Sequence, residues 1–168
     1  MRPYRTQAPT LAQQAFRLKM AQPGSSVRFD KHGNRMVWDG CLSPTAISDI
    51  YQTRIICTRQ QPRPLVFIVA PTLLELNGEP IPHRYEDNSL CLWQPAYHEW
   101  RSAFWIAETV IGWTSLWLFF YELWHACGEW LGGGEHPGEY KTSDEYECSQ
   151  SIETSRFRVD QRRLPHLS

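Results

Sequence analysis

The sequence predicts an α+β fold: a helix near the N-terminus, an antiparallel meander sheet of about four strands, and C-terminal helices rich in tryptophan. Three observations predict it. Residues 10–20 carry apolar side chains at helical spacing, residues 27–71 form short apolar runs between turn residues, and residues 101–130 return to helical spacing. The 168 residues suit one domain, because a chain of this length buries about 70% of its unfolded surface around one core.

The first helix is predicted from Thr10 to Met20. Thr10 suits a helix N-cap, and Leu11, Ala15 and Leu18 follow on one face. Pro23-Gly24 then stops the helix. Residues 1–9 are polar with two prolines, and we expect them to form a flexible N-terminus before a folded domain over residues 10–140.

The sheet is predicted from four apolar runs in sequence order. The runs VRFD and RMVWDGCL flank the turn residues KHGN, which favours a hairpin. IYQTRIICTR and PLVFIVAP then flank residues 60–63, so we expect them to pair as antiparallel neighbours. Asn77-Gly78 predicts a tight turn, and residues 79–90 lack either periodicity, which predicts a loop leading into Cys91.

The C-terminal helices are predicted over residues 101–130, where one or two helices should cover the sheet. Apolar residues at 106, 110, 113, 117, 120 and 124 recur every three or four positions before Gly132-Gly133-Gly134. Seven of the eight tryptophans lie in the second half of the chain, which favours an aromatic core there. Residues 141–168 are polar and charged, and we expect a mobile tail.

A membrane span over residues 104–121 is the alternative to a soluble core helix. The stretch approaches the length that a bilayer requires, but Glu108 lies inside it and Thr109, Thr114 and Ser115 dilute it. The N-terminus has no apolar stretch typical of a signal peptide, so we expect a cytoplasmic protein. A formal net charge of −1 gives no reason to expect nucleic acid or acidic lipid as a partner.

The five cysteines are expected to be free thiols, because their number is odd and no CxxC pair occurs. Cys57 lies in the middle of a predicted strand, and we expect it to be a small buried residue. Cys91 ends the polar loop of the segment PHRYEDNSLCLW, eight positions after His83. Three interpretations of Cys91 stay open on these residues alone: a structural residue, a nucleophile near His83, and a metal ligand with His83 and His98.

The metal interpretation extends to His125 with Cys127, but none of these groups has a recognised zinc spacing. We therefore expect no metal and no cofactor.

The order of these features resembles the ubiquitin-conjugating enzyme fold, in which a His-Pro-Asn stretch precedes a catalytic cysteine in an Ile-Cys-Leu context. Here Pro82-His83 precedes Leu90-Cys91-Leu92, with a spacing two residues shorter and no Asn directly after the pair. The chain is more similar to the prokaryotic relatives in CBASS antiphage operons, which look like PHxYxxxxLCL followed by a Trp-rich helix. The matching positions, from about 10 to 137, include Pro82-His83-Arg84-Tyr85, Leu90-Cys91-Leu92, Tyr121-Glu122-Leu123-Trp124, Gly128-Glu129-Trp130 and His136-Pro137.

The resemblance implies an acyl-carrying enzyme. Cys91 would hold the C-terminus of a partner as a thioester and pass it to a lysine of a target protein, and the partner would be a cGAS-like nucleotidyltransferase of the operon. Such a reaction needs a donor for the oxyanion. Asn88 is the predicted donor, in competition with the backbone of Cys91 and Leu92, and His83 would support the loop or act as a base. The alternative is a non-catalytic module that binds a partner through the same fold.

Overall fold

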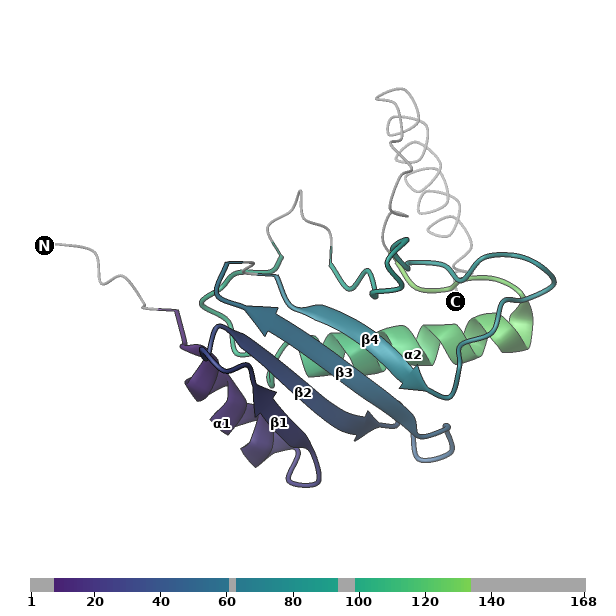
Figure 1. Ribbon diagram of the computed structural model, residues 1–168. Coiled ribbons are helices and arrows are strands. Elements are labelled where there is room, and N and C mark those ends of the chain that lie inside the picture. Colours follow the sequence, from purple (N-terminus) through teal and green to yellow (C-terminus); the bar gives the residue numbers. More distant parts are fainter. Residues whose placement is uncertain (1–7, 61–62, 94–98, 134–168) are drawn as a thin grey trace, which may run out of the picture. The chain divides into compact units, whose positions relative to one another are not determined.

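The computed structural model describes residues 8–60, 63–93 and 99–133. The elements are α1 (Leu11–Ala21), β1 (Ser26–Phe29), β2 (Arg35–Leu42), β3 (Tyr51–Thr58), β4 (Leu65–Ala70) and α2 (Val110–Cys127). The four strands form one antiparallel sheet in the order β1-β2-β3-β4, with α1 beside β1 and β2 and α2 behind the β4 side (Figure 1). The predicted α+β fold with a meander sheet and a C-terminal aromatic helix is confirmed.

Helix α1 begins with the reciprocal cap that Thr10 predicted. The Gln13 N–H donates to Thr10 Oγ1 at 3.3 Å, and the Thr10 N–H donates to Gln13 Oε1 at 2.8 Å. Each bond satisfies a backbone or side-chain group that the first helical turn otherwise leaves unpaired. The cap therefore sets where α1 starts and which face it turns toward the sheet.

The buried face of α1 also holds the segment that precedes α2. Gln14 is buried, its Nε2 donates to the Phe104 carbonyl at 2.8 Å, and its Oε1 accepts from the Ile106 N–H at 3.0 Å. These two hydrogen bonds join positions about ninety residues apart in the sequence. Gln14 thus connects the start of the fold to its C-terminal half.

The core lies on one face of the sheet, because alternate residues of each strand point to the same side. Met36 and Trp38 of β2 pair with Cys57 and Ile55 of β3, and all four are buried. Val66 of β4 pairs with Ile55 and extends this face. The same cluster includes buried residues of both helices, among them Leu18, Val110, Trp117, Leu118 and Trp124.

Helix α2 begins later and ends earlier than the helical spacing indicated. Residues 101–109 form turns, and the helix runs from Val110 to Cys127. Gly128 caps it, with a φ of 78° and an N–H bond to the Trp124 carbonyl. The late start follows from Gln14, because it binds the backbone of Phe104 and Ile106, groups that a longer helix would use internally. In the described ranges, every helix is too short or too polar to cross a bilayer.

The Asn77-Gly78 turn is confirmed. Both residues have positive φ, 54° and 82°, and the Glu79 N–H donates to the Leu76 carbonyl at 2.8 Å. Asn and Gly adopt this backbone region with little strain. The predictions for the polar tail over 141–168, for Cys148 and for His136-Pro137 fall outside the described residues.

Replacing Gly40 with alanine should destabilise the sheet, because the Trp38 ring lies directly over this position. An added Cβ would meet Trp38 Cζ2 at 2.3 Å and Cη2 at 2.4 Å, and the ring is fully buried. We expect Gly40→Ala to lower the free energy of unfolding by about 2 kcal/mol, measured by urea denaturation. Gly24→Ala, which meets nothing within 4 Å, is the matched control, and equal stability of the two variants would contradict this packing.

Candidate functional site

The loop before Cys91 folds into a small hairpin with Cys91 at its base. The Cys91 N–H donates to the His83 carbonyl at 2.9 Å, and the Tyr85 N–H donates to the Ser89 carbonyl at 2.9 Å. Between these bonds Arg84 and Leu90 form an antiparallel bridge. His83 and Cys91 are therefore held opposite each other by their backbones, although eight positions separate them.

Two further hydrogen bonds attach this hairpin to the body of the fold. The Leu90 N–H donates to the Val66 carbonyl at 2.9 Å, which joins the hairpin to β4. The Trp117 indole N–H donates to the His83 carbonyl at 3.0 Å, which joins it to α2. Cys91 consequently sits on a segment supported by both the sheet and the C-terminal helix.

The Cys91 thiol is half-buried and contacts Tyr85. The Sγ atom lies 3.3 Å from Tyr85 Oη, and the guanidinium of Arg63 lies over the Tyr85 ring at 4.8 Å from its centroid. From the sequence, Tyr85 was named only as a position of the matched motif, and Arg63 was not considered. The position of the tyrosine within the motif PHRYEDNSLCLW was the available signal, since the hairpin turns its side chain toward the cysteine.

Burial raises the pKa of the Cys91 thiol above its ordinary value, and the Glu99 carboxylate acts in the same direction. The hydrogen bond with Tyr85 and the charge of Arg63 lower this pKa and so oppose burial. Burial also raises the pKa of Tyr85 to about 12, so the phenol keeps its proton at neutral pH. Tyr85 is therefore a hydrogen-bond donor for a Cys91 thiolate once that thiolate forms.

His83 reaches Cys91 through its backbone. Its side chain is 6% exposed, its φ is 52°, and its ring packs against Trp130 with centroids 5.1 Å apart. Asn88, the predicted oxyanion donor, is exposed in the turn of the hairpin with φ 67°, and its N–H donates to the Tyr85 carbonyl at 2.9 Å. The structure thus places all three predicted site residues in one hairpin.

A cavity of about 300 Å³ opens beside Cys91. Its walls are formed by Leu92 and by aromatic and aliphatic side chains around α2: Trp113, Leu116, Trp117, Phe120 and Trp130. His83 and the backbone of Gly132 and Gly133 complete the lining. Among the described residues that line it, none is Asp, Glu, Lys or Arg, so the thiol borders an apolar recess.

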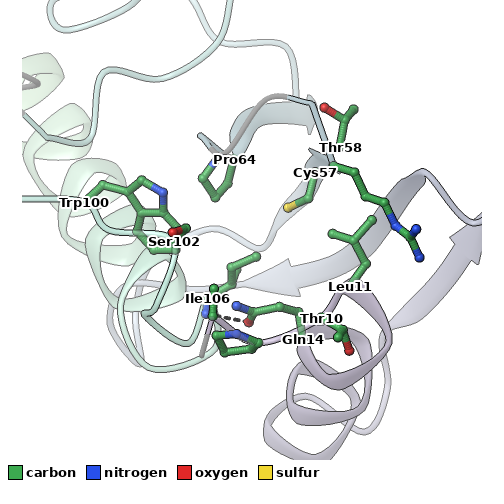
Figure 2. Close-up of a pocket in the computed structure, with 12 residues that line it drawn as sticks. Thr10, Leu11, Gln14, Cys57, Thr58, Pro64, Trp100, Ser102 and Ile106 are labelled. Atoms are coloured by element: carbon green, nitrogen blue, oxygen red, sulfur yellow. Dashed lines mark hydrogen bonds between the residues drawn. The ribbon is translucent and has the colours of Figure 1, made fainter. Parts of the chain in front are cut away.

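A second cavity, of about 420 Å³, lies between the start of α1, the end of β3 and the segment before α2. Figure 2 shows Cys57 facing this cavity near Leu11 and Pro64, with the Gln14–Ile106 hydrogen bond at its base. Burial raises the pKa of Cys57 to about 12, which keeps it a neutral thiol. The prediction that Cys57 is a buried small residue is confirmed.

The described cysteines are free thiols: Cys41, Cys57, Cys91 and Cys127. Across residues 8–60, 63–93 and 99–133, the structure shows no group of three or more His, Cys, Asp or Glu side chains placed to hold a metal ion. His98, one of the ligands weighed for a metal site, lies outside these residues.

The comparison with protein families gives one result. A family model described as "Type II CBASS E2 protein" matches residues 14–137, which is about three quarters of the chain. The matched range contains most of α1, the whole sheet, the Cys91 hairpin and α2. A search among curated proteins found no match.

Removing the Tyr85 hydroxyl should make Cys91 less reactive, because the phenol lowers the pKa of the thiol. We expect Tyr85→Phe to reduce the rate of iodoacetamide alkylation at pH 7.5 about three- to tenfold, since bonds to charged groups contribute about 1.5–3 kcal/mol before solvent screening. The measurement is site-resolved mass spectrometry from pH 6.5 to 10. The pH at which the alkylation rate of Cys91 increases should be higher in the variant than in the parent protein.

Exposed Cys41 in the same samples is the internal control for this experiment. An unchanged pH profile for Cys91 in Tyr85→Phe, with Cys41 also unchanged, would contradict a hydrogen bond between the phenol and the thiolate.

Proposed function

Because the chain belongs to the family of type II CBASS E2 proteins, we propose that it is a cysteine-dependent protein-conjugating enzyme. Cys91 carries the C-terminal acyl group of a partner protein as a thioester and transfers it to a lysine of a target. The observation that carries the proposal is the placement of Cys91, a half-buried thiol beside a hydroxyl donor and an apolar cavity.

The other described cysteines suit this role less well. Cys57 is buried, and burial raises the pKa of its thiol to about 12. Cys127 is exposed and lines neither cavity described above, and exposed Cys41 lines a smaller cavity of about 200 Å³ that also contains the charged side chains of Asp39 and Arg54. A thioester carrier needs a thiol that a protein terminus can reach and a surface that orients the terminus. Cys91 combines both properties.

The proposed reaction has two acyl transfers. The Cys91 thiolate attacks an activated C-terminal carbonyl of the partner, a C–S bond forms, and the activating group leaves. A lysine amine of the target then attacks the thioester, the C–S bond breaks, and the nitrogen loses a proton to solvent as the isopeptide forms. Attack of the Cys91 thiolate on a peptide carbonyl upstream of the partner's last residues would expel those residues as an amine, and water would then hydrolyse the thioester. The same thiol therefore also supports trimming of the partner's C-terminus.

Each transfer places negative charge on a carbonyl oxygen, which a hydrogen-bond donor stabilises by about 3 kcal/mol. The Cys91 N–H already donates to His83, whereas the Leu92 N–H has no acceptor among the described residues. We propose Asn88 as the side-chain donor and the Leu92 N–H as its backbone counterpart. His83 acts in this scheme as a positioning residue, since its carbonyl holds both Cys91 and Trp117.

The proposed partner is the cGAS-like nucleotidyltransferase of the same CBASS operon, which supplies its C-terminus. Attachment of that terminus to a target lysine then regulates the antiphage cyclic-oligonucleotide signal. This assignment rests on the family membership and not on a surface of the chain.

The conjugation is tested by expressing the operon with variants of this chain and analysing the partner on non-reducing gels. We expect a thiol-sensitive adduct between the two proteins, which Cys91→Ala abolishes and Cys91→Ser either abolishes or converts into a thiol-resistant ester. Cys41→Ser, at an exposed thiol, is the matched control and should retain the adduct. An undiminished adduct and full phage defence with Cys91→Ala would favour a non-catalytic binding module instead.

Asn88→Ala should separate the two oxyanion donors. If the amide contributes to transfer, the variant slows single-turnover release of the acyl group to lysine by about 10²-fold, as for other donors of this kind. Asn88 is exposed, so its replacement should leave folding intact, which circular dichroism checks. A parental transfer rate would assign the oxyanion to the Leu92 N–H alone.

A further inference from the structure

The cavity beside Cys91 has features that select a substrate class. We propose that it receives a large apolar side chain, such as that of Leu, Met or Phe, from one of the last two residues of the protein terminus that Cys91 carries. This inference rests on the proposed function and adds the chemical requirement that the terminus must meet. The C-terminal segment so selected is called the donor tail below.

The wall of the cavity is rigid and aromatic. Trp130 lies 5.1 Å from the His83 ring, 5.7 Å from Trp117 and 6.1 Å from Phe120, measured between ring centroids. Trp117 is itself fixed by its hydrogen bond to the His83 carbonyl. Rings held in this way offer a preformed apolar surface, which costs little ordering when a side chain binds.

The cavity lacks groups that would receive a charged side chain. Its lining, as far as the described residues form it, contains the neutral groups named above and His83. A carboxylate or ammonium placed there would lose hydration without gaining an ion pair, whereas an aliphatic or aromatic side chain gains by leaving water. A donor tail ending in charged residues is therefore disfavoured at this site.

The reach of the cavity restricts which residues can enter it. Cys91 is part of the wall, so the recess begins at the atom that bonds the terminal carbonyl. Consecutive Cα atoms are about 3.8 Å apart, and side chains of an extended segment alternate in direction. The last two residues of the donor tail are consequently the ones whose side chains lie beside the recess.

Glycine at position 132 keeps the inner wall free of a side chain. A Cβ there would lie 2.6 Å from Trp130 Nε1 and 2.9 Å from Phe120 Cδ2. The Trp130 indole N–H is buried and has no acceptor in the described part of the chain. Gly132 lies directly beside this N–H, so the indole edge packs against the chain's own backbone. Glycine at position 132 thus lets the backbone approach the Trp130 and Phe120 rings and adds no side chain to the cavity.

The inference is tested with synthetic peptide thioesters, which need no activating enzyme. The probes are acetyl-Gly-Ser-Ser-X-Gly and acetyl-Gly-Ser-Ser-Gly-X alkyl thioesters, with X as Leu, Phe, Ala, Asp or Lys. In the reaction the Cys91 thiolate displaces the alkyl thiol and becomes acylated. Its rate is followed by intact-protein mass spectrometry and divided by the rate with glutathione, which removes intrinsic differences between the thioesters.

We expect Leu and Phe to acylate Cys91 at least tenfold faster than Asp or Lys in one of the two probe series. Leu116→Lys provides the second arm, because Leu116 lines the cavity and is 53% exposed, so the variant can fold normally. A lysine there should reduce the Leu-to-Asp preference at least tenfold. Leu74→Lys, at a 62% exposed position that does not line this cavity, is the matched control and should keep the parental preference.

The possible outcomes distinguish this inference from the proposed function. Acylation of Cys91 at equal normalised rates for every X overturns the apolar requirement while leaving Cys91 a competent acyl carrier. A preference that Leu116→Lys does not change also overturns it, since the selection then lies elsewhere. Failure of every probe to acylate Cys91, with glutathione reacting normally, overturns the proposed function and the inference together.

Discussion

The candidate site depends on one hydrogen-bond acceptor, the carbonyl oxygen of His83. It accepts the N–H of Cys91 at 2.9 Å and the indole N–H of Trp117 at 3.0 Å, and so connects the cysteine-bearing hairpin to α2. A carbonyl has two lone pairs, so a single backbone group can bind both partners. His83 adopts a positive φ of 52°, a backbone region that most residues with a side chain avoid, and this conformation accompanies the arrangement.

The hydrogen bond from Trp117 to the His83 carbonyl explains why an aromatic helix lies next to a polar loop. Trp117 contributes its N–H to the hairpin and its ring to the cavity, and Trp130 closes the opposite side against the His83 ring. Tryptophan suits such a position because it combines a large apolar surface with one donor. The tryptophan content of the second half of the chain thus supplies the core and, in our proposal, the surface that orients the acyl group.

The fold was predictable because its determinants are local. Alternating apolar runs, the Thr10 cap and the Asn77-Gly78 turn act over a few residues, and the structure confirms each of them. The start of α2 was not predictable, since it depends on Gln14, about ninety residues away. At the candidate site, Cys91, His83 and Asn88 were predicted from a motif, and the three residues lie in one hairpin. The Tyr85–Cys91 contact and the apolar cavity emerge only when the hairpin, α2 and the Gly132 segment are brought together.

The hydrogen bond from Leu90 to Val66 has a consequence for solubility. Strand β4 is the last strand of the sheet, and its sequence, LVFIVA, is the kind of apolar run that self-associates when its backbone is unpaired. Leu90, the residue before Cys91, occupies this free edge at Val66. Opening this hairpin would therefore free the edge of β4 at Val66 for pairing with another chain.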